Sequence, residues 1–162
     1  MGLLVAISIV ACHKEERAVV GVAQNAVKAE HQAQAAAQAT ATERDQQRAA
    51  LALIPLPTKS LYVDVHDASA WANPFLSVGA ESLSLRITVA GPHQQETQLR
   101  PADLAKTVTA LPPGVWRYGR VIAVAESPEA SRQDRTKVRR NVEDAMQVLN
   151  DLGIVVEEWP TR

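Results

Sequence analysis

Residues 121–156 read VIAVAESPEASRQDRTKVRRNVEDAMQVLNDLGIVV, and this stretch decides the fold. The apolar run Val121–Ala125 predicts an interior strand of a sheet. Apolar residues recur at helical spacing across 131–152, which predicts an amphipathic helix. Those residues are Val138, Val142, Ala145, Leu149 and Leu152. Gly153 is well placed to end the helix, and Ile154–Val156 opens a last strand.

Further strands are expected before this stretch. Leu61, Val63 and Val65 alternate with more polar residues, which predicts a strand with one buried face. Phe75–Val78 and Leu83–Val89 read as two more strands. The residues between these two, GAES, fit a hairpin turn, so antiparallel pairing is expected.

A shorter helix is expected between these strands and the central run. It begins near Pro101, places Leu104, Val108 and Leu111 on one face, and stops at Pro112. The element order is then strand, strand, strand, helix, strand, helix, strand. This order predicts the α+β class, a two-layer sandwich of a mixed four- to five-stranded sheet with two helices on one face.

A long Ala/Gln-rich helix is expected before this domain. Residues 18–53 contain no proline and consist mostly of strong helix formers. Such a helix would act as a spacer about 50 Å long. Its Ala-rich face offers a route to oligomerisation, although large residues do not form a sustained heptad pattern. The prolines at 55 and 57 predict a linker over 54–60, with the folded domain over 61–162.

The first residues have the pattern of an export signal. Residues 3–11 form an uncharged, mostly apolar run about half as long as a bilayer-spanning helix. The sequence Ile9-Val10-Ala11-Cys12 then resembles the lipobox of bacterial lipoproteins. The resemblance implies a signal peptide over 1–11, cleavage before Cys12, and lipid on that cysteine. It departs from the family pattern because no Lys or Arg precedes the apolar run.

The same resemblance implies a location in the bacterial cell envelope. A protein anchored through Cys12 faces the periplasm, with residues 12–53 as lipidated cysteine and spacer. In the family, an Asp directly after the cysteine tends to retain the protein at the inner membrane. That position is His13 here, which favours the outer membrane. The alternative is an apolar N-terminus with a buried, inert cysteine.

The charge of the chain argues against nucleic acid as a partner, and its cysteine content excludes an intramolecular disulfide. The chain has 17 basic and 18 acidic residues, for a formal net charge of −1, so nucleic acid is not expected as a partner. A single cysteine cannot form an intramolecular disulfide. The expected partners are the membrane, through lipid on Cys12, and an envelope protein or a cell-wall component.

The order of elements over 61–159 resembles the periplasmic domain of the ExbD/TolR family of biopolymer-transport proteins. The shared feature is a strand, a long amphipathic helix, a glycine and a final strand. The resemblance implies a similar fold and, as an alternative function, an accessory role in an envelope transport system. The sequence lacks that family's membrane-spanning helix with a proton-relaying Asp, so no functional residue is carried over.

One local group resembles a metal or acid–base site. Asp64 and His66 would lie on the same face of the expected strand, next to Asp67. This supports a small metal-dependent enzyme as a further alternative, while a solvated strand face explains the same residues. No catalytic residue, metal site or cofactor is otherwise indicated. The basic residues between 132 and 140 fit a solvated helix face, or an anionic docking patch.

Trp116, Tyr118 and Arg120 are the best candidates for a partner surface. Trp and Arg are favoured at interaction hot spots, and aromatic residues make up 4% of this chain. The alternative is that these aromatic residues close the end of a small core. The sequence therefore favours a non-catalytic envelope lipoprotein that presents a small α+β binding domain.

Overall fold

The computed structural model describes residues 12–90 and 93–160 and divides into two compact units, residues 1–43 and 44–162. The expected signal peptide, 1–11, and the first three residues of the lipobox match lie outside the described residues. The long helix α1 spans Cys12–Ala52, which confirms a long helix over most of the expected range 18–53. Its side chains over 28–43 are exposed, as their Ala, Gln and charged character favours.

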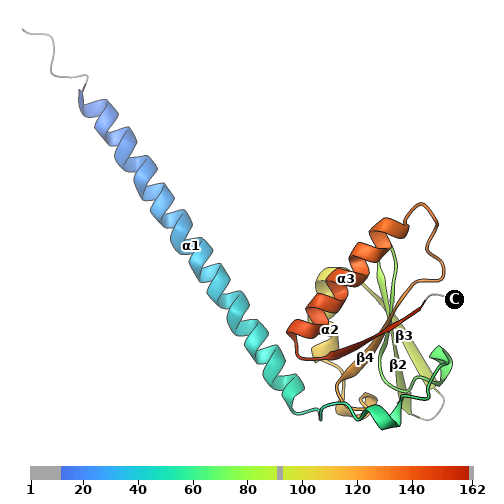
Figure 1. Ribbon diagram of the computed structural model, residues 1–162. Coiled ribbons are helices and arrows are strands. Elements are labelled where there is room, and N and C mark those ends of the chain that lie inside the picture. The colour runs from blue at the N-terminus through green and yellow to red at the C-terminus, as the bar shows by residue number, and fades with distance from the viewer. Residues whose placement is uncertain (1–11, 91–92, 161–162) are drawn as a thin grey trace, which may run out of the picture. The chain divides into compact units, whose positions relative to one another are not determined.

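The second unit is built on a mixed five-stranded sheet, as predicted (Figure 1). The strands occur in the spatial order β3-β2-β1-β4-β5. Their bounds are β1 Phe75–Val78, β2 Leu83–Ala90, β3 His93–Leu99, β4 Val121–Glu126 and β5 Val155–Trp159. The β1–β2 and β2–β3 pairs are antiparallel, whereas β4 is parallel to both β1 and β5. The predicted hairpin closes where Gly79 N donates to Ser82 O at 2.9 Å.

Two helices cover one face of this sheet, which confirms the two-layer arrangement (Figure 1). They are α2, Leu104–Thr109, and α3, Arg135–Asp151. Their buried residues pack against one set of alternating strand side chains in the main core. In β4 this set is Ile122 and Val124, while Val121 and Ala123 point to the other face. We call this other face the open face.

The strand predicted over 61–65 is wrong. The chain there forms a short 3₁₀ helix, Lys59–Leu61, followed by turns. Leu61 and Val63 are 55% and 50% exposed, whereas Tyr62 between them is buried. The alternation of Leu61, Val63 and Val65 is misleading because Tyr62, and neither Leu61 nor Val63, packs into a buried cluster.

A polar edge strand takes the place of the missing one. Strand β3 has the sequence HQQETQL, and its side chains are exposed except for Leu99. Such a strand carries no hydrophobic periodicity, so it was not predicted. A bulge in the β2–β3 pairing between Thr88 and Ala90 shifts the register, which leaves Val89 exposed. The predicted element order therefore holds with a different third strand.

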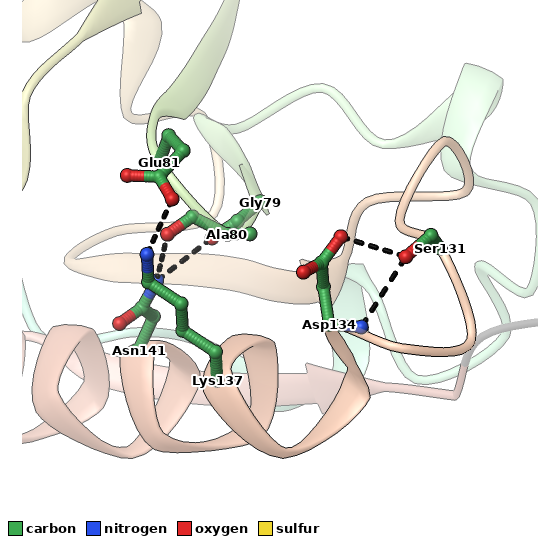
Figure 2. A network of polar contacts seen from close by, with 7 residues as sticks. All are labelled: Gly79, Ala80, Glu81, Ser131, Asp134, Lys137 and Asn141. Carbon is green, nitrogen blue, oxygen red and sulfur yellow. Dashed lines mark hydrogen bonds and ion pairs between the residues drawn. The ribbon is translucent and has the colours of Figure 1, made fainter.

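Polar contacts join α3 to the β1–β2 turn (Figure 2). Asn141 Nδ2 donates to the carbonyls of Gly79 and Ala80 at 2.9 and 3.0 Å, and Lys137 pairs with Glu81. Between these two residues on the helix, Arg139 pairs with Glu143 at 3.2 Å and also with Glu158. These ion pairs are those of a solvated helix face.

The second unit begins before the expected linker. Leu51 and Ile54 are buried in its main core. The following residues are bonded to the segment before β4, where Arg120 N donates to Pro55 O at 2.8 Å and Thr58 N to Tyr118 O at 3.0 Å. Residues 55–58 are therefore an ordered part of the second unit.

Candidate functional site

A strap formed by residues 59–72 crosses part of the open face. Its second 3₁₀ helix, Ala68–Ala70, begins where Asp67 Oδ1 accepts from Ser69 N at 2.8 Å. On the side of β5, Tyr62 Oη donates to Glu157 at 3.2 Å. On the side of β2, Arg86 donates to the carbonyl of Ala68. The strap is thus fastened to strands at both sides of the sheet.

An aromatic cluster fixes the strap to the open face. Trp71 is 1% exposed, and its ring centroid lies 5.4 Å from Tyr62, 5.2 Å from Tyr118 and 5.5 Å from Trp159. The indole nitrogen of Trp71 donates to Pro74 O at 3.1 Å, so its polar atom is satisfied. Trp159 also meets Phe75 edge-to-face. Such aromatic pairs add stability beyond their buried area.

A half-open cavity of about 810 Å³ lies beside the strap. We call this cavity the groove. The strap and the aromatic cluster form one wall, and residues 127–129 lie along another part of its rim. Its volume falls within the range of roughly 300–1,000 Å³ that is typical of small-ligand pockets.

The floor of the groove is a row of small side chains that crosses the sheet. In the strand register, Ser77 of β1 is paired with Ser84 of β2 on one side and Ala125 of β4 on the other. The row ends at Gln98 of β3 and Trp159 of β5. Because the three central side chains are small, the row is low in the middle.

The groove is acidic. Its lining contains six carboxylate residues and two basic residues. The acidic residues are Asp67, Glu96, Glu126, Glu129, Glu157 and Glu158; the basic residues are Lys59 and Arg86. This excess contrasts with the whole chain, whose formal net charge is −1. A cleft lined by one sign of charge raises the local concentration of the opposite charge.

Arg86 has a structural role within the groove. Its guanidinium lies 4.6 Å from the centre of the Phe75 ring and donates to the strap. Burial lowers the pKa of Arg86, and the negative charges of Glu96 and Asp67 act in the opposite direction. Arginine nevertheless stays protonated in proteins. Its charge is therefore fixed beside Phe75 in the lining of the groove.

Asp64 and His66 do not converge as the sequence suggested. The chain forms no strand there, so the two side chains are not placed on one face; both residues are exposed in the strap. His66 lines the groove, together with Asp67. Within residues 12–90 and 93–160, no three His, Cys, Asp or Glu side chains are grouped so that they could hold a metal ion.

Trp116, Tyr118 and Arg120 do not form one exposed patch. Trp116 is 5% exposed and belongs to the main core, which matches the alternative of aromatic residues that close a small core. Tyr118 is half-buried in the aromatic cluster on the open face. Trp116 Nε1 and Arg120 Nε are buried without a hydrogen-bond partner among the described residues.

The sequence did not single out the floor of the groove. Ser77, Ser84 and Ala125 lie far apart in the chain and become neighbours only through the strand register. The available signal was the polar side of the predicted strand at 83–89, where Ser84 and Arg86 alternate with leucines. That alternation predicts which residues face away from the helices, but not which residues they meet.

Tyr62 provides a pH-dependent test of how the strap is attached. Burial raises the pKa of its hydroxyl, and the hydrogen bond to Glu157 and that carboxylate's charge act in the same direction. The stabilisation is present below the unfolded-state pKa of about 10 and is lost as pH rises through the higher folded-state pKa. We expect Tyr62→Phe to flatten the loss of stability above pH 10, measured by urea denaturation across pH. Identical alkaline slopes for both proteins would contradict this assignment.

Comparison with protein-family models, with curated proteins and with solved structures finds no match. In the part of the chain that the structure describes, no helix is both long enough and apolar enough to cross a bilayer. The groove and the sequence pattern around Cys12 are the features that bear on function.

Proposed function

We propose that this protein is a non-catalytic cell-envelope lipoprotein whose α+β domain binds a protein or cell-wall partner in the groove. The main observation in support of a binding role is the cavity of about 810 Å³ on the open face. It combines small floor residues, an aromatic wall and fixed hydrogen-bonding groups, which is the usual composition of a binding site.

Two carboxylates of the groove are held by neutral donors. Glu157 accepts from the hydroxyl of Tyr62, and Glu96 accepts from the hydroxyl of Ser84. A hydroxyl donor fixes the position of a carboxylate and leaves its negative charge in place. Preorganised acceptors of this kind favour binding because their side chains lose less entropy when a ligand arrives.

The anchor is proposed from the lipobox match that ends at Cys12. The helix α1 then supplies the spacer between the lipid and the folded domain. Several acyl chains are enough for a stable anchor, because each buried CH₂ contributes about 0.8 kcal/mol. In this arrangement the folded domain and its groove lie in the periplasm. The residue that follows the cysteine is His13 and not Asp, which favours an anchor in the outer membrane.

Replacing the cysteine tests the anchor directly. We expect the wild-type chain, produced in a bacterial host, to fractionate with membranes and to resist a high-salt wash. Cys12→Ser is expected in the soluble fraction, because the thioether that carries the lipid cannot form. Mass spectrometry of the mature N-terminus should detect an acylated cysteine in the wild type.

A neighbouring variant provides the control. His13→Asp keeps the lipidated cysteine, so it should remain in the membrane fraction but move from the outer to the inner membrane. If the wild type and Cys12→Ser both fractionate as soluble protein, the lipid anchor is refuted.

A further inference from the structure

We infer that the groove binds an extended, basic peptide segment, with its lysine or arginine side chains directed at the acidic lining. This inference rests on the proposed function, because it assigns a ligand class to the same groove. Three features of the groove support it: the length of the floor, the charge of the lining and the exposure of the aromatic wall.

The length of the floor suits a short extended chain. The row from Gln98 to Trp159 crosses all five strands. At a strand spacing of about 4.8 Å, it is roughly 19 Å long. An extended peptide advances about 3.3 Å per residue, so about six residues would span the row.

The charge of the lining selects a cation. The lining contains six carboxylate residues and two basic residues. Glu158 is paired with Arg139 of α3, and Arg86 is engaged by Phe75 and the strap, so the excess of negative charge remains. Glu157, near the Trp159 end of the groove, accepts a hydrogen bond from neutral Tyr62 and keeps its charge. An anionic peptide or a nucleic acid would be repelled by the same lining.

The aromatic wall suits the apolar stem and charged end of lysine or arginine. Tyr62, Trp71 and Phe75 are buried, whereas Trp159 is half-buried and lines the groove. A cation beside an indole gains stabilisation from the ring quadrupole, in addition to ion pairing with the carboxylates. Glu157 lies on the same face of β5 as this ring, where it accepts from Tyr62, so both contributions can act on one side chain.

Calorimetric titration of the full-length chain with defined probes tests the inference. The probes are an acetylated and amidated hexapeptide of alternating lysine and alanine, the same peptide with glutamate in place of lysine, and a chitin oligosaccharide as a cell-wall glycan. We expect the lysine peptide to bind and the glutamate peptide not to bind. Affinity should fall as the salt concentration rises from about 50 mM to about 500 mM.

A matched pair of variants locates the binding. Glu157→Gln removes one charge from the groove and keeps an oxygen that can accept from Tyr62. We expect it to weaken binding of the lysine peptide about threefold to fivefold. Asp144→Asn removes the same charge from an exposed position on α3, outside the groove, and should leave affinity unchanged. Ala125→Trp fills the middle of the floor and should abolish binding.

The outcomes separate this inference from the proposed function. Failure of the lysine peptide to bind, or equal weakening by Glu157→Gln and Asp144→Asn, would overturn the ligand class. If the chitin oligosaccharide binds instead and Ala125→Trp prevents it, the groove is still the binding site, but for a glycan. If no probe binds and Ala125→Trp behaves like wild type in every titration, the inference is overturned and the groove loses its support as a binding site.

Discussion

Replacing Gly119 by alanine is expected to lower the free energy of unfolding by about 2–4 kcal/mol. Gly119 has a φ of +87°, which an alanine adopts only at a cost in energy. An added Cβ would also lie 2.6 Å from Leu56 O and 2.8 Å from Pro55 O. These backbone atoms cannot retreat freely, because Pro55 O accepts from Arg120 N and Thr58 N donates to Tyr118 O.

Two other glycines separate the effects of strain and crowding. Gly153 has a φ of +77°, but its added Cβ would meet only a side-chain nitrogen of Arg120 at 3.8 Å. Gly153→Ala is therefore expected to cost about 1 kcal/mol, from the backbone alone. Gly114 has neither a positive φ nor a neighbour within 4 Å, so Gly114→Ala should stay within about 0.5 kcal/mol of wild type. Urea denaturation followed by tryptophan fluorescence measures all three.

The order of these three costs is the critical result. If Gly119→Ala costs no more than Gly153→Ala, residues 55–58 do not pack against Gly119, and the second unit begins after the linker. A cost clearly above that of Gly153→Ala supports the placement of residues 55–58 in the folded unit.

Asn73→Ala is expected to cost about 3–5 kcal/mol. Asn73 is 1% exposed, and its side chain makes three hydrogen bonds to the backbone around the start of β4. Its Nδ2 donates to Gly119 O and Val121 O at 2.8 Å each, and its Oδ1 accepts from Tyr118 N at 2.8 Å. Alanine would leave these buried backbone groups without that partner, and water has little access to replace it.

A second asparagine serves as the control for Asn73. Asn141 uses the same amide to donate to two carbonyls of the β1–β2 turn, but it is half-buried (Figure 2). Water can take its place, so Asn141→Ala should cost about 1 kcal/mol. Asn73→Asp keeps the acceptor and turns a carboxylate toward two carbonyls, so it should cost at least as much as Asn73→Ala. Equal costs for the alanine variants at 73 and 141 would show that burial does not amplify the loss.

The strength of each sequence pattern explains which elements were predicted. Val121–Ala125 and the helical repeat that follows it belong to β4 and α3, whose apolar residues are buried. Leu83 and Leu85 alternate with Ser84 and Arg86 for the same reason. Strand β3 has no comparable pattern, because an edge strand exposed to water does not require apolar side chains.

The candidate site was less predictable than the fold. The sequence marked His66 as a candidate site residue, and it lines the groove, but its expected partner Asp64 does not. Trp116, a candidate for the partner surface, lies in the core, as the alternative interpretation expects. Composition and spacing do not show which of several tryptophans has a buried space to fill, because that space is made by other parts of the chain.

The sequence by itself determined the helices, the hairpin and the β-α-β end of the domain, because burial of one face imposes a local period of 2 or 3.6 residues. Tertiary structure alone decided the groove. Its floor brings together Ser77, Ser84 and Ala125 through strand register, and its wall forms where the strap packs on the open face. Both features depend on contacts between residues distant in the chain, which leave no local period in the sequence.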